Sequence, residues 1–163
     1  LLQILPPGAS LFVGSSLPVR DIDTFGGGRP EALRILSNRG ANGIDGIVAT
    51  AAGASVAVAP APVWVLIGDL AFLHDSTTLL DLRTRAVRLR LVVVDNGGGG
   101  IFSFLPQASV VEPDRFEQLF GTRQHLDVAD VLTDEQMFAA GQGGDPGNVE
   151  IVRLGHGDGA QTH

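Results

Sequence analysis

Polar side chains follow two β-rich runs of this sequence, at the point where each run ends. An uncharged run at residues 63–67 leads to Asp69, and a second run at residues 89–94 leads to Asn96 and four glycines. Loops that leave the carboxyl ends of parallel strands meet in one crevice of an open α/β sheet. We therefore expect Asp69 and Asn96 to converge, although they lie far apart in the chain.

The residue types at this expected meeting point are ligands for a hard cation. A carboxylate, an amide oxygen and a backbone carbonyl of the glycine run supply oxygens, but too few for the octahedral coordination of Mg²⁺. Phosphate oxygens and water would complete the set. Glycines fit this arrangement, because a backbone without Cβ approaches a phosphate closely and turns its N–H groups inward. The pattern predicts a site for a cation and a phosphorylated ligand.

Alternating strands and helices must position these residues. Short apolar runs predict strands at residues 11–13, 32–36, 63–67, 89–94 and 149–154. Helices are expected after the 14–16 turn, in an Ala-rich segment that ends near Val58, and at residues 75–85, 127–132 and 134–140. The 75–85 helix would form the crossover between the two motif strands. The sequence thus predicts an α/β fold with a mostly parallel sheet flanked by helices.

Composition excludes several classes of partner. A net charge of −7 and a pI near 4.8 argue against binding to nucleic acid or an anionic membrane. The chain has no cysteine, which excludes disulfides and thiolate metal sites and is compatible with the cytoplasm. The uncharged stretch from Gly46 to Gly68 is long enough for a membrane span, but Pro60 and Pro62 break it into a helix and a strand. We expect a cytoplasmic protein without a membrane span.

Four segments carry a resemblance to a known family. Gly68-Asp69 followed by Asn96 is similar to the motif of thiamine diphosphate-dependent enzymes. The segments GSSLPVRDID, SNRGANGIDG, GDLAFLHD and VVVDNGGGGIFSFLP resemble the 2-succinyl-5-enolpyruvyl-6-hydroxy-3-cyclohexene-1-carboxylate synthases of menaquinone biosynthesis. The resemblance covers about residues 11–121 and the C-terminal, diphosphate-binding domain of those enzymes. Leu70 agrees with this narrower family, whereas Gly97 replaces its usual asparagine.

The resemblance implies a cofactor, a cation and the residues that bind them. Thiamine diphosphate would be bound with Mg²⁺, or with Mn²⁺ in its place, and the cation ligands would be Asp69, Asn96 and the Gly98 carbonyl. Ile44 would lie under the thiazolium ring and support the bent shape of the cofactor. The implied cofactor-binding residues are Ile44, Gly68, Asp69, Leu70, Ala71, Asn96, Gly98, Gly99 and Ile101.

The implied reaction decarboxylates 2-oxoglutarate and adds the product to isochorismate. Both substrates carry carboxylates, which is a physical reason for arginines to face the pocket. The implied substrate-binding residues are Ser16, Arg20, Arg39, Phe102 and Leu105. We expect the apolar IFSFLP segment to form a buried pocket wall. No catalytic residue is expected on this chain, because the activating Glu of the family lies on a separate pyrimidine-binding domain.

Simpler roles stay open for several of these residues. Ser16 would serve equally as a helix N-cap, with Arg20 as a solvated charge. Ile44 is compatible with packing of the first helical turn, and Phe102 with ordinary core packing. At the level of function, the alternatives are a thiamine-dependent 2-oxo acid decarboxylase or synthase of other specificity, and a non-catalytic remnant domain.

The expected domain organisation is one domain over residues 1–163 that forms part of a longer chain. The part after about Gly121 is expected to be divergent or truncated, because the closing helix of the family is not recognisable there. The implied partners are the pyrimidine-binding domain and further subunits, in a homodimer or a dimer of dimers.

Overall fold

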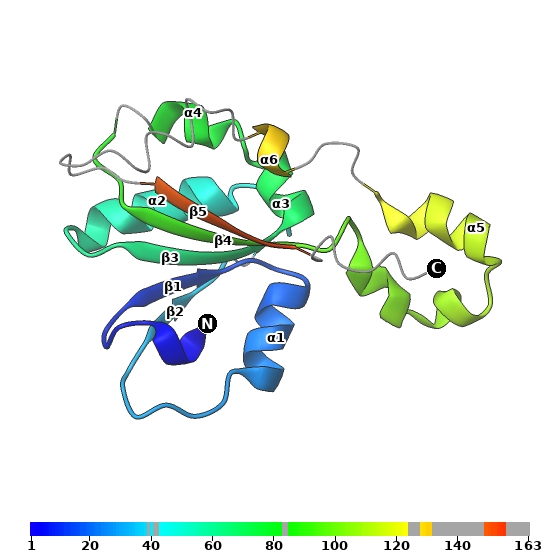
Figure 1. Ribbon diagram of the computed structural model, residues 1–163, viewed down its shortest axis with the longest axis horizontal. Coiled ribbons are helices and arrows are strands. Elements are labelled where there is room, and N and C mark those ends of the chain that lie inside the picture. Colours follow the sequence, from blue (N-terminus) through cyan, green and yellow to red (C-terminus); the bar gives the residue numbers. More distant parts are fainter. Residues whose placement is uncertain (39, 41–42, 83–84, 124–127, 132–148, 156–163) are drawn as a thin grey trace, which may run out of the picture.

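The fold is a five-stranded parallel sheet with helices on both faces (Figure 1). The computed structural model describes residues 1–38, 40, 43–82, 85–123, 128–131 and 149–155. The strand order is β2-β1-β3-β4-β5. The strands are β1 (Ser10–Val13), β2 (Arg34–Leu36), β3 (Val63–Gly68), β4 (Leu89–Asp95) and β5 (Val149–Gly155). All four ladders are parallel, as the sequence predicts.

Helices cover the two faces unequally. One face carries α2 (Ile47–Val58), α3 (Asp69–His74), α4 (Thr78–Leu82) and α6 (Val128–Val131), and the opposite face carries α1 (Leu17–Phe25) and the short 3₁₀ helix η1 (Leu2–Ile4) (Figure 1). The larger core lies under α2 and α3, where Val65, Ile67 and Leu91 are fully buried. Strand residues alternate between the faces, so Leu66 and Val92 belong to the smaller core beside α1.

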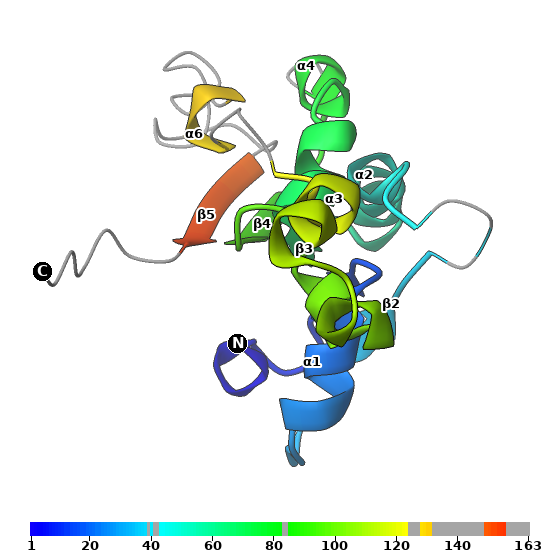
Figure 2. The ribbon, with the colours of Figure 1, turned by 90° about the vertical axis from the view of Figure 1, so that its right-hand side faces the viewer.

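The segment after β4 leaves the sheet and forms a separate lobe. It contains the 3₁₀ helices η2 (Gly100–Phe104) and η3 (Pro106–Ser109), α5 (Pro113–Phe116) and a π-helical turn, η4 (Glu117–Gly121). Figures 1 and 2 show this lobe, residues 100–121, standing off the edge of the sheet where β3 and β4 end. The lobe therefore lies beside the carboxyl ends of these two strands.

Two secondary-structure predictions need correction. The helix expected at 75–85 is confirmed only over Thr78–Leu82, as the short α4, and the β3–β4 crossover also contains α3, which starts directly at the strand end. The break comes at Asp75, whose side chain is drawn to the start of α2. The second strand starts at Arg34 and not at residue 32, because its partner β1 begins at Ser10. The predicted end of the Ala-rich helix near Val58 is confirmed.

The C-terminal predictions are tested only in part. A helix is present at Val128–Val131, within the predicted 127–132 segment, and the last strand is present at Val149–Gly155. The helix predicted at 134–140 lies outside the described residues. Among the helices that the structure describes, none has the length and apolarity that a membrane crossing requires.

Candidate functional site

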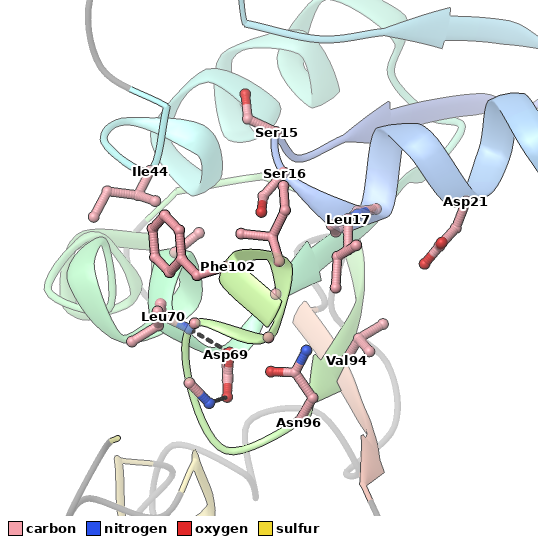
Figure 3. A pocket seen from close by; sticks show the side chains of 17 residues that line it. Ser15, Ser16, Leu17, Asp21, Ile44, Asp69, Leu70, Val94, Asn96 and Phe102 are labelled. Carbon is pink, nitrogen blue, oxygen red and sulfur yellow. Dashed lines mark hydrogen bonds between the residues drawn. The ribbon is translucent and has the colours of Figure 1, made fainter. Parts of the chain in front are cut away.

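A pocket lies at the carboxyl ends of β3 and β4, between α1, α3 and the lobe. Its volume is about 160 Å³. The residues that line it come from four segments of the chain: Ser15, Ser16, Leu17, Pro18, Asp21, Ile44, Gly68, Asp69, Leu70, Ala71, Val94, Asn96, Gly98, Gly99, Gly100, Ile101 and Phe102. Figure 3 shows Ile44 and Phe102 at one end of the pocket and Asp69 and Asn96 at the other. We call these the ring end and the cation end.

Asp69 is the most deeply buried polar group of the pocket, with an exposed fraction of 4%. It is the first residue of α3, so its carboxylate is presented at the point where β3 ends. Its two oxygens accept hydrogen bonds from the backbone N–H groups of Leu70 and Gly98, both at 2.8 Å. Burial raises the pKa of the Asp69 carboxyl above its ordinary value of 3.8, the two N–H groups lower it, and nearby Asp95 raises it further.

This carboxylate forms no ion pair with any side chain in the described part of the chain. Two N–H groups offset only part of the cost of burying a charge, and a cation would offset the rest. The environment of this buried carboxylate is therefore compatible with a bound cation.

Asn96 and the glycines form the opposite wall of the cation end. Figure 3 shows the Asn96 amide on the side of the pocket next to Asp69. The amide packs against Gly100, where an added Cβ would lie 2.8 Å from Asn96 Nδ2. Gly97 turns the chain with φ +79° and donates its N–H to Asp95 Oδ1 at 3.2 Å. Asp95 is itself held by Arg153 of β5, with 2.8 Å between Nη2 and Oδ2.

Gly98 and Gly99 are required by the protein itself, which the sequence argument did not foresee. Gly98 has φ +130°, and an added Cβ would lie 2.7 Å from the Gly121 carbonyl oxygen. A Cβ on Gly99 would lie 2.7 Å from the Phe120 carbonyl oxygen. The Gly99 N–H donates a hydrogen bond to the Gly121 carbonyl oxygen at 2.9 Å. Close approach to a phosphate explains the run only in part, since the returning end of the lobe packs against it.

The ring end is apolar and partly open. Ile44 is 42% exposed, and Phe102 is half-buried. Phe102 packs against Phe120, with ring centroids 6.0 Å apart, and Phe120 stacks on Phe116 at 4.9 Å. Phe120 of the lobe therefore supports the Phe102 ring on one side, while Phe102 also lines the pocket.

The α1 side of the pocket contains Asp21, which was not among the predicted site residues. Ser16 occupies the N-cap position with φ +72°, but its hydroxyl makes no capping hydrogen bond, so the N-cap explanation does not account for this residue. Leu17 and Asp21, one turn apart on α1, both line the pocket. Arg20 points elsewhere: it donates to the Ser16 carbonyl at 2.6 Å and lines an adjoining cavity.

Most of the predicted site residues converge in this pocket. Among the predicted residues, Ser16, Ile44, Gly68, Asp69, Leu70, Ala71, Asn96, Gly98, Gly99, Ile101 and Phe102 line it. Arg20 and Leu105 do not line it, and Arg39 lies outside the described residues. Which ligand each residue binds stays a prediction. The sequence analysis missed Asp21, although its spacing of four from Leu17 on a predicted helix was an available signal.

The expectation of a buried wall made of the whole IFSFLP segment is wrong. Ile101 and Phe102 line the pocket, but Phe104 is 78% exposed and Leu105 is 37% exposed. The segment folds into 3₁₀ turns, whose side chains spread around the axis, so only part of its apolar surface faces inward.

The cation end fits a divalent metal and a diphosphate. In the described residues, no group of three or more His, Asp or Glu side chains could hold a metal ion by itself. The pocket instead combines one carboxylate with amide and carbonyl oxygens, which leaves Mg²⁺ positions for phosphate and water. A Cβ built on Gly68 meets nothing within 4 Å, so this backbone is open to close approach.

Sequence comparisons agree with this geometry. Residues 29–133 match the family described as "Thiamine pyrophosphate enzyme, C-terminal TPP binding domain". The chain belongs to this family. Similar curated proteins carry the name 2-succinyl-5-enolpyruvyl-6-hydroxy-3-cyclohexene-1-carboxylate synthase, and the chain resembles their thiamine pyrophosphate-binding domain. The resemblance and the α/β fold predicted from the sequence are both confirmed.

Three of these relatives show the extent of the match. The synthase of Listeria monocytogenes serotype 4b (strain F2365) is 51% identical over 127 residues, which is 78% of this chain and 21% of the relative. The synthase of Chloroflexus aurantiacus is 54% identical over 125 residues, or 77% and 21% of the two chains. That of Geobacillus thermodenitrificans is 51% identical over 129 residues, or 79% and 21%. The chain therefore spans about a fifth of the length of these relatives.

Proposed function

We propose that this chain is the diphosphate-binding domain of a synthase that decarboxylates 2-oxoglutarate and adds the product to isochorismate. The observation that carries the proposal is the convergence of Asp69, Asn96 and Gly98 in one pocket with Ile44 and Phe102. The names of relatives that are about 50% identical support the choice of reaction. Thiamine diphosphate, when bound, supplies the carbanion stabilisation that decarboxylation of a 2-oxo acid requires.

At the cation end, the chain's own groups bind charge. Asp69, the Asn96 side-chain oxygen and the Gly98 carbonyl are the proposed ligands of Mg²⁺ or Mn²⁺. Asp69 is already oriented by the N–H groups of Leu70 and Gly98. The first N–H groups of a helix have no intrahelical partners, so the Ala71 N–H at the start of α3 is available to the diphosphate. Binding a cation here also neutralises the buried carboxylate.

At the ring end, the chain provides walls. Ile44 and Phe102 present apolar surface that excludes water from one side of the bound thiamine. Because these two side chains are partly exposed, we propose that a second wall is supplied by the pyrimidine-binding domain of a complete enzyme. The four-fifths of the relatives' length that this chain does not match offers room for that domain. A fragment of a longer chain, assembled as a homodimer or dimer of dimers, follows as part of the proposal.

The substrates are assigned to the α1 side of the pocket. Ser15 and Ser16 line both the pocket and the adjoining cavity that contains Arg20, so the Arg20 guanidinium lies beside the pocket rim. We propose that Arg20 and Arg39 bind substrate carboxylates, with Ser16, Phe102 and Leu105 as the remaining contacts. The cytoplasmic location stays a prediction.

The decisive experiment measures cofactor binding and turnover separately. Calorimetry of the 163-residue chain with thiamine diphosphate should give binding that requires Mg²⁺, and chelation with EDTA should abolish it. Mixing the chain with a separately produced pyrimidine-binding domain should yield product from 2-oxoglutarate and isochorismate, which the chain alone should not form. Absence of Mg²⁺-dependent binding would favour a non-catalytic remnant, and turnover by the chain alone would contradict the two-domain site.

A further inference from the structure

Asp75 is a buried carboxylate that the proposed function does not use. Its exposed fraction is 7%, and it follows directly after α3. Its Oδ2 accepts hydrogen bonds from Val48 N at 2.6 Å and Ala49 N at 3.1 Å, and its Oδ1 accepts from Thr78 Oγ1 at 2.8 Å. Val48 and Ala49 are the second and third residues of α2, so the carboxylate caps this helix from another part of the chain.

The start of α2 needs such a cap because it cannot supply its own. Gly46 occupies the N-cap position with φ +67°, a conformation that favours glycine and leaves no side chain to accept a hydrogen bond. The Gly46 carbonyl is engaged by Thr50 Oγ1 at 2.6 Å and by Asn38 Nδ2 at 3.3 Å. The free N–H groups of the first turn are left to Asp75, and their partial positive charge suits its carboxylate.

This contact joins the two ends of the cofactor pocket through the protein. Asp69 starts α3 and Asp75 directly follows it, so the carboxylate that caps α2 is rigidly connected to the cation end. Ile44 lies three residues before the first residue of α2 and belongs to the ring end. The chain of contacts therefore runs from Asp69 along α3, through Asp75 to α2, and back to Ile44.

We propose that Asp75 is a positioning residue, which sets the place of Ile44 relative to Asp69 by holding the start of α2 against the end of α3. It contacts neither cofactor nor substrate in this arrangement. The inference rests on the proposed function, since it concerns the ring end of the same cofactor pocket. Loss of Asp75 loosens the 43–46 turn, whose other contacts include His74 Nδ1 of α3, 3.8 Å from Asp45 Oδ1. It leaves the cation end intact, because Asp69, Asn96 and Gly98 have their own contacts.

Two probes separate the ends of the pocket. Mg²⁺ with inorganic pyrophosphate contacts only the cation end, whereas Mg²⁺ with thiamine diphosphate contacts both. In calorimetry of the 163-residue chain, Asp75→Ala should lower thiamine diphosphate affinity by about fivefold, within the loss expected from removing the Ile44 side chain itself, and change pyrophosphate affinity by less than about twofold. Asp75→Asn should show an intermediate loss, since its one side-chain oxygen keeps an acceptor for the α2 N–H groups. If Asp75→Ala does not fold, the Asn variant carries the test.

Ser55→Ala is the matched control. Ser55 is 1% exposed near the other end of α2, and its Oγ accepts a hydrogen bond from Arg88 N at 2.7 Å. This variant should lose stability through a buried hydrogen bond but keep the ratio of the two affinities. A ratio that stays constant in the Asp75 variants, or falls equally in Ser55→Ala, would overturn the positioning role.

Amide hydrogen exchange gives a readout that needs no ligand. Asp75→Ala should speed exchange at residues 43–49 and leave residues 69–71 as protected as in the parent chain. Unchanged exchange at 43–49 would overturn the inference whatever the ligands do. If the parent chain binds neither probe, the proposed function fails, and the role of Asp75 toward a cofactor fails with it, while the exchange data still report on the α2 contact.

Discussion

The two ends of the pocket are built by different means. At the cation end, Asp69 is 4% exposed and both its oxygens are hydrogen-bonded to backbone, while at the ring end Ile44 is 42% exposed. The cation end is made from the ends of two adjacent buried strands, so its geometry is fixed by the sheet. The ring end is made from a turn and from the lobe, which pack on the sheet from outside. In the proposed function, the chain would therefore supply the charged half of the cofactor site and one wall of its apolar half.

Replacing Gly98 by Ala should have the largest effect on this comparison, because it damages the cation end and the lobe together. The new Cβ would lie 2.7 Å from the Gly121 carbonyl oxygen, at φ +130°. We expect a loss of about 3 kcal/mol in the free energy of unfolding and a fall of roughly 10 °C in Tm, measured by urea and thermal denaturation.

Gly97→Ala is the control for this prediction. Gly97 has φ +79°, but a Cβ there meets nothing within 4 Å. It should cost only about 1 to 2 kcal/mol, the strain of a left-handed alanine. Equal losses in the two variants would show that backbone conformation, and not the packing of the lobe against the glycine run, decides the requirement for Gly98.

Asp69→Asn and Ile44→Ala test the two ends against each other. Asn keeps one acceptor but loses the charge, so Mg²⁺-dependent binding of thiamine diphosphate should fall by about 100-fold or more, above the 10–100-fold typical of residues that only support metal ligands. Ile44→Ala should weaken thiamine diphosphate binding by only about 3- to 10-fold in the isolated chain, because its wall is half open. Calorimetry with both ligands measures this, and a larger loss from Ile44→Ala would contradict the division of the site.

The raised pKa of Asp69 predicts opposite pH dependences for folding and for cation binding. Without a cation, the contribution of Asp69 to stability is full below its ordinary pKa of 3.8 and is lost as the pH rises through the raised value. Mg²⁺ needs the ionised carboxylate, so its affinity is full above the raised pKa and falls about tenfold per pH unit below it.

Urea denaturation and Mg²⁺ titration across this range check both signs. The Asp69 contribution is the difference between the parent chain and Asp69→Asn. Asp114→Asn, which removes an exposed carboxylate of the lobe, is the control that should leave both profiles in place. Parallel pH profiles for stability and cation affinity would show that another group controls them.

The sheet and the cation end were predictable because they follow from local rules. Apolar runs that end in Asp69 and Asn96 had to be buried strands, and parallel strands bring their carboxyl ends together. The Ala-rich helix had to end before Pro60, which cannot continue it. The resemblance to synthases suggested which ligands to propose, which residue spacing alone does not indicate.

Tertiary contacts decided the rest of the site. No local signal tells that Gly98 must leave room for the Gly121 carbonyl and Gly99 for the Phe120 carbonyl, because residues 120–121 reach the glycine run only through the folding of the lobe, which also packs Phe102 on Phe120. Similarly, Asp75 looks like a helix-starting residue in sequence, but its carboxylate satisfies the first turn of α2 instead of a helix of its own. The strands and the polar residues at their ends depend on neighbouring residues, so both could be predicted from the sequence. Only the folded chain decided which side chain caps α2, which way Arg20 points and how the lobe meets the glycine run, since these depend on donors and acceptors brought together from distant segments.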